Sequence, residues 1–135
     1  MAKIVKMQND DKNFYKDLGE LITNKSVIKE LGEPIITDSS QVWFVAYKDN
    51  KVIGFCSNYS RKDGFYIGYL YVVGSERGNG LGAKLLKKQI DFAKENKVDA
   101  INVVATMQYS KLFEKYGFQT IYEYVKYKKM RAELL

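Results

Sequence analysis

Histidine is absent from this chain of 135 residues, and cysteine and proline occur once each. Without histidine the chain lacks the residue most often used as a general base near neutral pH, so proton transfer must fall to other side chains. The single cysteine, Cys56, cannot form an intramolecular disulfide, and without histidine it completes no zinc site and no Cys–His catalytic pair. The sequence therefore predicts no metal centre.

Long hydrophobic runs are also missing. No stretch approaches the roughly 18 apolar residues of a membrane span, and the first residues, MAKIVK, lack the apolar segment of a signal peptide. We therefore expect a cytoplasmic protein, used in a reducing compartment and without a membrane partner. No repeat, low-complexity segment or proline-rich linker divides the chain, so a single domain over residues 1–135 is expected.

Positive charge exceeds negative charge, because Lys and Arg number 22 against 16 Asp and Glu, a formal net charge of +6. This sign suits an anionic partner, although the lysines are spread along the chain as on an ordinary solvated surface. Nucleic-acid binding would depend on aromatic and basic residues near the C-terminal end: Tyr122, Tyr124, Lys126, Tyr127, Lys128 and Lys129. Their alternation is also typical of an edge strand with exposed lysines, and we favour that interpretation.

The spacing of apolar residues predicts a mixture of strands and helices. Strands are predicted at residues 3–7, 42–47, 51–57, 64–73 and 100–105, and two more within 118–130. Helices are predicted from a cap at Asn9 or Asp10 through Ile22, around residues 27–31 up to Gly32, at 81–96 and at 109–116. With 46% hydrophobic residues, the chain can build one packed core.

A glycine-rich loop, Ser75-Glu76-Arg77-Gly78-Asn79-Gly80-Leu81-Gly82, follows the strand at 64–73 and leads into the helix at 81–96. Backbone N–H groups at the start of a helix bind phosphate oxygens, and the glycines let a ligand approach the backbone. Arg77 adds a positive charge. The spacing matches neither the dinucleotide fingerprint nor the P-loop. The loop therefore predicts a site for an anionic diphosphate outside both of these nucleotide folds.

Arg77, Gly80 and Gly82 fit the pattern Q/R-x-x-G-x-G/A, and through it the chain resembles the GNAT family of acyl-CoA-dependent N-acetyltransferases. Three other segments are similar to the family: residues 52–55, residues 70–72, and Leu112-Phe113-Glu114-Lys115-Tyr116-Gly117-Phe118. The resemblance implies an α/β (α+β) fold with a mixed, V-shaped, twisted sheet of about seven strands and about four helices. In such a sheet the strands at 65–73 and 100–105 splay apart, and the pantetheine arm of the cofactor takes the place of a missing strand.

The resemblance also implies a binding site for acetyl-CoA as co-substrate. The backbone of Leu70, Val72 and Val73 would pair with pantetheine. The pyrophosphate would be held by the following loop, which consists of Arg77, Gly78, Asn79, Gly80, Leu81, Gly82 and Ala83, and Phe113 would also lie against the cofactor. Lys84, Lys87 or Lys88 would meet the remaining phosphate, unless these lysines are simply solvated.

The sequence departs from the family pattern at positions that matter for proton transfer. Many members protonate the departing thiolate with a tyrosine, and the matching position here is Phe113. An asparagine common at the end of the fifth strand is matched by Thr106 or Met107, and the strand at 65–73 has no glutamate to deprotonate the amine. Tyr66 and Tyr109 are the candidate catalytic residues, although both also suit packing in a core or groove.

The predicted function is transfer of an acetyl group from acetyl-CoA to an amine by direct attack in a ternary complex, with a backbone N–H near Val72 holding the oxyanion. The alternative is a catalytically weak acyl-CoA-binding or interaction protein on the same fold. The acceptor, small molecule or protein, stays open, as does a homodimer. The segment that shapes the acceptor pocket in this family contains Glu20, Glu30, Glu33, Asp38 and Trp43, each of which also suits surface charge or core.

Overall fold

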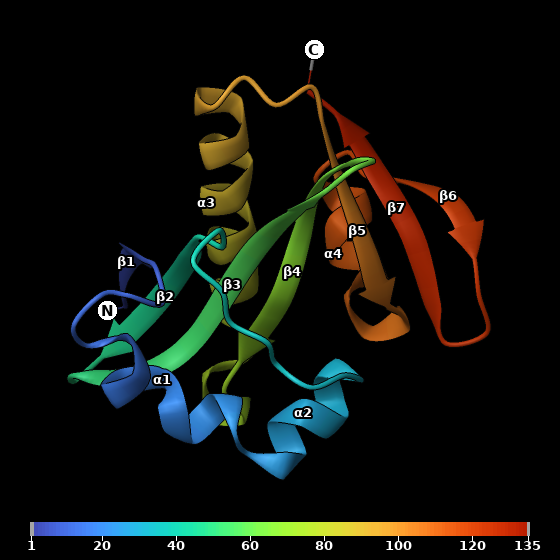
Figure 1. Ribbon diagram of the computed structural model, residues 1–135. Helices are drawn as coiled ribbons and strands as arrows, with labels where there is room; N and C mark the ends of the chain where they lie inside the picture. The colour runs from blue at the N-terminus through green and yellow to red at the C-terminus, as the bar shows by residue number, and fades with distance from the viewer. Residues whose placement is uncertain (1, 135) are drawn as a thin grey trace.

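Seven strands form one sheet in the computed structural model, which describes residues 2–134 (Figure 1). The spatial order is β1-β2-β3-β4-β5-β7-β6. Neighbouring strands are antiparallel except β4 and β5, which run parallel. Their bounds are β1 Lys3–Met7, β2 Trp43–Lys48, β3 Lys51–Arg61, β4 Gly64–Val72, β5 Ala100–Thr106, β6 Gln119–Glu123 and β7 Tyr127–Glu133.

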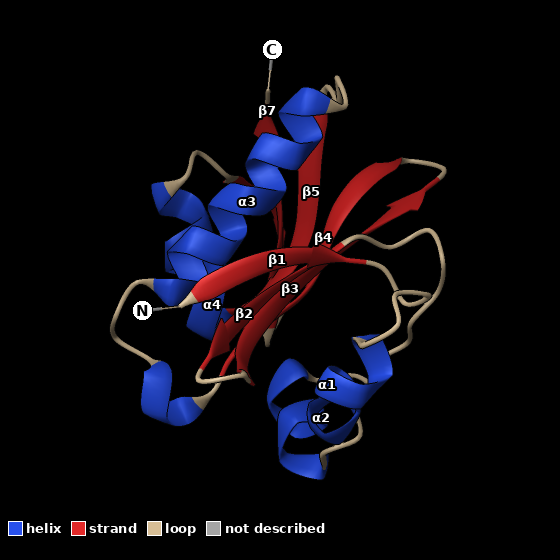
Figure 2. Cartoon of the chain, turned by 90° about the vertical axis from the view of Figure 1, so that its left-hand side faces the viewer, coloured by secondary structure: helices blue, strands red, loops and turns tan. Residues whose placement is uncertain are grey.

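Helices cover both faces of this sheet, with α1 and α2 on one side and α3 and α4 on the other (Figure 2). Their bounds are α1 Phe14–Ile22, α2 Lys25–Leu31, α3 Leu81–Glu95 and α4 Met107–Lys115, and a 3-10 turn covers Gly74–Glu76. The seven-stranded mixed sheet with four helices confirms the fold that the sequence predicts.

Two hydrophobic clusters lie on the two faces of the sheet. Leu85 and Leu86 of α3 and Phe113 of α4 pack on one face. Phe14 of α1 packs on the other against Trp43, with ring centroids 5.3 Å apart, and the Trp43 side chain is fully buried. The sheet is therefore the shared wall of two cores, which explains why its central strands are apolar on both faces.

A buried amide pair fixes α3 to the sheet. Gln89 is fully buried, accepts a 2.8 Å hydrogen bond from the Asn58 side chain, and donates a 2.8 Å bond to the Cys56 carbonyl. Burial of these polar groups is tolerated because they satisfy one another. Sequence periodicity does not predict the contact between Gln89 and Asn58, because a glutamine on a helix is normally expected to face solvent.

Some predicted boundaries are wrong. The helix cap expected at Asn9 or Asp10 does not form, because the Asp11 carboxylate accepts the Gln8 N–H at 2.6 Å in a turn, and α1 begins only at Phe14. The strand predicted to end at residue 57 continues to Arg61, where β3 pairs with the start of β4. The last strand likewise passes residue 130 and ends at Glu133.

Strands β4 and β5 pair over only three positions, Phe65 with Ile101, Tyr66 with Asn102 and Ile67 with Val103. Beyond these pairs the two strands diverge, as Figure 1 shows at their lower ends. This geometry confirms the expected V shape. We call residues 65–67 and 101–103 the joined half of the V, and residues 68–72 and 104–106 the open half.

A bulge in β4 marks the point where the two halves meet. Gly68 and Tyr69 together lie opposite Ser57 of β3, and the Ser57 hydroxyl accepts the Tyr69 N–H at 2.9 Å. A β-carbon at Gly68 would lie 2.5 Å from the Ser57 Oγ, so only glycine fits without rearrangement. Bulges bend a strand and increase its twist, so this one turns β4 where β5 leaves it.

Candidate active site

The open half of β4 presents to the gap peptide groups that have no strand partner. The Val73 N–H donates to the Ile53 carbonyl of β3 at 2.8 Å. Because bonded and non-bonded pairs alternate along antiparallel strands, Tyr71 also faces β3, whereas the peptide groups of Leu70 and Val72 point toward β5. Beyond Ile67 no β5 residue pairs with them. Leu70 and Val72 therefore offer a free strand edge.

Val73 differs from these two residues. Its N–H is bound to Ile53, and its carbonyl accepts the Glu76 N–H at 2.9 Å in the 3-10 turn. The resemblance places Val73 among the pantetheine contacts, but the structure gives its backbone other partners. The β4 residues that face the gap without a strand partner are therefore Leu70 and Val72, and of their groups the Val72 carbonyl accepts the Arg77 Nε at 2.8 Å.

The glycine-rich loop ends at the N-terminus of α3. Gly78 and Gly80 adopt left-handed φ angles of +86° and +79°, which favour glycine. Gly80 is the N-cap residue and has no side-chain cap, and the first helical bond runs from the Lys84 N–H to the Gly80 carbonyl. The N–H groups of Leu81, Gly82 and Ala83 thus have no intrahelical partner and are available to an anion.

The surroundings of this helix start suit a phosphate group. A β-carbon at Gly82 would lie 3.7 Å from the Leu112 Cδ2, an ordinary contact, so packing does not require glycine there. Because glycine has no side chain, a ligand can approach the backbone at this position. Asn79 and Lys84 line a hollow of about 200 Å³ beside the loop, together with the paired side chains of Lys48 and Glu76. Of the other lysines expected at a phosphate, Lys87 pairs with Asp91 at 3.5 Å and Lys88 is exposed.

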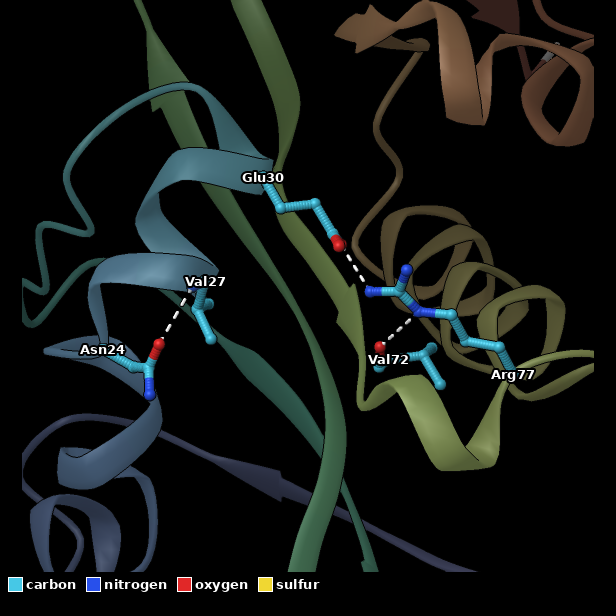
Figure 3. Close-up of polar contacts among 5 residues, drawn as sticks. All are labelled: Asn24, Val27, Glu30, Val72 and Arg77. Atoms are coloured by element: carbon cyan, nitrogen blue, oxygen red, sulfur yellow. Dashed lines mark hydrogen bonds and ion pairs between the residues drawn. The ribbon is translucent and has the colours of Figure 1, made fainter.

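The Arg77 side chain extends toward Glu30 and the Val72 carbonyl (Figure 3). The Nε donates to the Val72 carbonyl at 2.8 Å, and one terminal nitrogen forms a 2.5 Å ion pair with Glu30 of α2. The guanidinium lies 5.5 Å from the centroid of the Tyr71 ring. The hydrogen bond to Glu30 raises the pKa of Arg77 above its ordinary value. The expected positive charge at the loop is thus present, but it is directed at Glu30.

Local structure in α2 holds Glu30 in place. The Asn24 side chain caps the helix by accepting N–H bonds from Ser26 at 2.8 Å and Val27 at 3.2 Å. Gly32 closes the helix with a φ of +84°, and Val27 is buried against the sheet. Sequence analysis placed Glu30 in the acceptor segment without a partner, because Arg77 lies 47 residues farther along the chain.

Tyr109 lies in the first turn of α4, close to the open half. Its side chain is half-buried, and burial raises its pKa; the nearby Glu30 charge raises it further, while Arg77 lowers it. Phe113, one turn later, is 2% exposed and packs edge-on against Phe118. The charges of Glu30 and Arg77 therefore act on Tyr109, and Phe113 lies in the core.

Tyr66 lies in the joined half, where it pairs with Asn102. Its hydroxyl donates to the Asp63 carboxylate at 2.6 Å, and its ring stacks on Tyr59 with centroids 5.1 Å apart. The hydrogen bond to Tyr66 lowers the pKa of Asp63. The hydroxyl of Tyr66 is therefore directed toward the β3–β4 turn, and the structure does not bring it to the free edge at Leu70 and Val72.

Thr106 occupies the end of β5, directly before α4. Among residues 2–134 its Oγ1 and the Trp43 Nε1 are the buried side-chain polar atoms without a hydrogen-bond partner. A buried hydroxyl without a partner costs free energy unless a ligand or water satisfies it. Thr106, one of the two residues that the resemblance matches to the family's asparagine, thus supplies a polar atom at the end of β5.

The aromatic and basic residues near the C-terminal end form the outer part of the sheet. Tyr122, Tyr124 and Tyr127 lie with successive ring centroids 4.5 Å apart, and all three are exposed. Lys128 lies within 3.7 Å of carboxylates of Glu114 and Glu123. The sequence predicts an edge strand in this segment. The strand at the edge of the sheet is β6, whereas β7 lies between β5 and β6.

Residues 2–134 contain neither a metal-binding cluster nor a membrane-spanning helix. No three histidine, cysteine, aspartate or glutamate side chains in this range gather closely enough to hold a metal ion. No helix in the same range has the length and apolar character needed to span a membrane.

Comparisons with known proteins agree with this geometry. ElaA from Escherichia coli is 15% identical, with a TM-score of 0.80 over 98% of this chain and 100% of its own. An acyl-CoA N-acyltransferase from Pseudomonas aeruginosa is 19% identical, with a TM-score of 0.78 over 98% of this chain and 99% of its own. A GNAT family acetyltransferase from Elizabethkingia anophelis with acetyl-CoA bound is 19% identical, with a TM-score of 0.68 over 98% of each chain. At these identities the structures share the fold alone.

The sequence itself shows the family. None of the curated protein sequences compared with this chain matches it significantly. Residues 9–132, however, match the family model described as the acetyltransferase (GNAT) domain. Because this match spans most of the chain and the structure has the corresponding fold, the protein belongs to the GNAT acetyltransferase family.

Proposed function

We propose that this protein transfers an acetyl group from acetyl-CoA to the amine of an acceptor. The observation that carries the proposal is the open half of the V, where the free edge at Leu70 and Val72 leads to the unpaired N–H groups at the start of α3. A pantetheine arm carries amides followed by a pyrophosphate. A strand edge followed by an anion site matches that order of groups.

The residues present fit such a ligand. We assign the pantetheine amides to the peptide groups of Leu70 and Val72, and the pyrophosphate to the backbone of residues 78–83. The orphaned Thr106 hydroxyl would gain a partner, and Lys84 beside the loop would meet a further phosphate. Acetyl-CoA, when bound, supplies an acyl group activated as a thioester.

Two kinds of chain group would serve the transfer itself. A backbone N–H near Val72 that faces the gap and is not taken by pantetheine can donate to the oxygen that gains negative charge as an amine attacks. The Tyr109 hydroxyl is protonated at neutral pH, as an ordinary tyrosine is, and can give its proton to the departing sulfur. Tyr66 is the second candidate, although its hydroxyl is engaged by Asp63.

Amine choice follows from the lack of a base in β4, which contains no Asp or Glu from Gly64 to Val72. An α-amine has a reference pKa of about 8 and a lysine amine about 10.4, so an α-amine needs less help to lose its proton. We therefore expect α-amines to be acetylated faster than lysine side chains. A panel of peptides that offers either a free α-amine or a lysine, compared by kcat/KM, tests this, and faster acetylation of lysine contradicts it.

A second candidate function is acyl-CoA binding with little or no turnover. It is favoured by Phe113 in place of the family's usual acid and by the lack of a carboxylate in β4. Binding of acetyl-CoA without release of free coenzyme A in the presence of a broad amine panel would select it over the transferase.

The experiment that tests the site is calorimetric titration of the protein with acetyl-CoA. Gly80→Glu should abolish binding, because it adds a charged side chain at the phosphate loop. The matched control is Gly32→Glu, which introduces the same residue at a similar φ of +84° with open space around it, but on α2. Wild-type binding that Gly80→Glu loses and Gly32→Glu keeps supports the site. Absence of wild-type binding contradicts both candidate functions.

A further inference from the structure

The Glu30–Arg77 ion pair connects the two faces of the molecule across the open half of the V (Figure 3). Glu30 belongs to α2, which lies on the face opposite α3, and Arg77 precedes the loop that leads into α3. Their charged groups are 2.5 Å apart, and the two side chains keep 25% and 34% of their surface exposed. This pair therefore ties α2 to the phosphate loop.

The same arginine covers part of the free strand edge. Of the two β4 carbonyls that face the gap, the Val72 carbonyl already accepts the Arg77 Nε at 2.8 Å. The guanidinium lies over the Tyr71 ring and extends from Val72 toward α2. It consequently occupies the line along β4 where a strand, or a ligand that replaces a strand, would have to run.

The two partners of this contact differ in how firmly the fold holds them. Glu30 is on a capped helix whose Val27 is buried against the sheet. Arg77 follows a single 3-10 turn and precedes Gly78 and Gly80, around which a β-carbon would find no atom within 4 Å. Movement of the backbone at position 77 therefore disturbs a loop, whereas movement of the backbone at position 30 disturbs a capped helix that packs on the sheet.

We propose that the Glu30–Arg77 pair is a latch over the Val72 carbonyl, which the pantetheine arm displaces when acetyl-CoA binds. The inference rests on the proposed function. Glu30 is then a positioning residue, because it holds Arg77 on the acceptor that pantetheine needs. When the latch opens, α2 is also released from the phosphate loop, so occupancy of the cofactor site changes the restraint on the helix across the gap.

The latch predicts that loss of Glu30 strengthens coenzyme A binding. In Glu30→Gln the arginine has no charged partner, and the affinity for coenzyme A should rise about one and a half to five-fold, the range for a partly exposed ion pair. Removal of a negative charge alone also favours an anionic ligand. Glu33→Gln controls for this, because it removes the same charge nearby and Glu33 forms no ion pair among the described residues.

The decisive test is a double-mutant cycle with Glu30→Gln, Arg77→Gln and the double variant. The readout is the free energy of unfolding, measured without ligand and with saturating coenzyme A. Glutamine at position 77 still fits the family motif and cannot form the ion pair. The expected result is a coupling between the two positions in the free protein that disappears in the complex.

The outcomes separate the latch from the function on which it rests. A wild-type protein that binds coenzyme A and shows equal coupling with and without it overturns the latch alone, because Arg77 then stays on Glu30 in the complex. Equal affinities of Glu30→Gln and Glu33→Gln for coenzyme A also overturn it. A wild-type protein that binds no coenzyme A overturns the proposed function, and the latch with it.

Discussion

The joined half and the open half of the V belong to the same two strands but satisfy their polar groups in different ways. In the joined half, β4 and β5 pair, the Tyr66 hydroxyl donates to Asp63, and the Asn102 side chain donates to the Phe65 carbonyl at 3.2 Å. In the open half, Leu70 and Val72 lack a strand partner and the Thr106 hydroxyl lacks any partner. The two β4 residues without a strand partner and the unpartnered Thr106 hydroxyl thus lie in the same half of the V, where a ligand can complete them.

The largest expected effect separates two tyrosines, one near each half. Tyr109→Phe removes the proposed acid and should lower kcat by about 10²- to 10⁴-fold, the usual contribution of general acid–base catalysis, with little change in acetyl-CoA affinity. Tyr66→Phe is the matched comparison and should change kcat far less, because its hydroxyl is bound to Asp63. Steady-state kinetics with a substrate amine decide between them. A larger loss in Tyr66→Phe would reverse the assignment.

The pH dependence of kcat sharpens the same assignment. Tyr109 must be protonated to act as an acid, and burial raises its pKa above the ordinary value of about 10. Activity should therefore persist below that pKa and fall only as the pH rises through it. If kcat falls with rising pH already below pH 10, and Tyr109→Phe shows the same fall, another group supplies the proton.

A second prediction aims at the point where the halves meet. Gly68→Val places side-chain atoms where the Ser57 Oγ already lies, 2.5 Å from the first added carbon. Overpacking of this kind costs about 1–3 kcal/mol, so the free energy of unfolding in urea should fall by that amount. Gly19→Val is a control for the loss of glycine, because no atom lies within 4 Å of its β-carbon. Equal stability of the two variants would show that the bulge is not required.

A third prediction concerns the orphaned hydroxyl of the open half. Thr106→Val keeps the shape of the side chain and removes a group that has no partner, so the stability of the free protein should not fall. Its affinity for acetyl-CoA should weaken by about 0.5–1.5 kcal/mol, the value of one hydrogen bond. Calorimetry and urea unfolding measure the two effects separately. Unchanged affinity would remove Thr106 from the site.

The smallest expected effect lies in the joined half. The Tyr66 hydrogen bond holds the pKa of Asp63 in the folded protein below its ordinary value. The ionised Asp63 therefore stabilises the fold at pH values above its pKa in the unfolded chain. This stabilisation is lost as the pH falls through the lower pKa of the folded protein. Tyr66→Phe should return the Asp63 pKa toward 3.8. Titration of the carboxyl signal by NMR checks this. The same Asp63 pKa in both proteins would show that the hydrogen bond does not govern it.

Sequence reasoning recovered the parts of this molecule that depend on local patterns. The strands and α2, α3 and α4 follow from apolar periodicity, and the glycine-rich loop follows from its spacing. The bulge at Gly68 was not predicted, because it depends on Ser57 of the neighbouring strand. The contact between Arg77 and Glu30 was not predicted either, because the order of charges along the chain does not reveal which helix end faces which loop.

The choice between Tyr66 and Tyr109 shows the same limit. Both are tyrosines on elements that flank the gap, and the sequence offered them as equal candidates. Only the structure shows that the Tyr66 hydroxyl is used by Asp63, whereas Tyr109 is half-buried and subject to the charges of Glu30 and Arg77. Which way a side chain turns at a strand end is decided by tertiary packing, which no single segment encodes.

The burial of Trp43 gives this protein an internal optical reporter. It is the single tryptophan of the chain, fully enclosed beside Phe14 and Tyr69 on the face opposite α3. An indole in apolar surroundings emits at shorter wavelength than one in water, so unfolding should shift the fluorescence to the red. The sheet separates this indole from the N-terminus of α3. Its emission therefore reports on the packing of the core beneath α1, also when a ligand is bound at the start of α3.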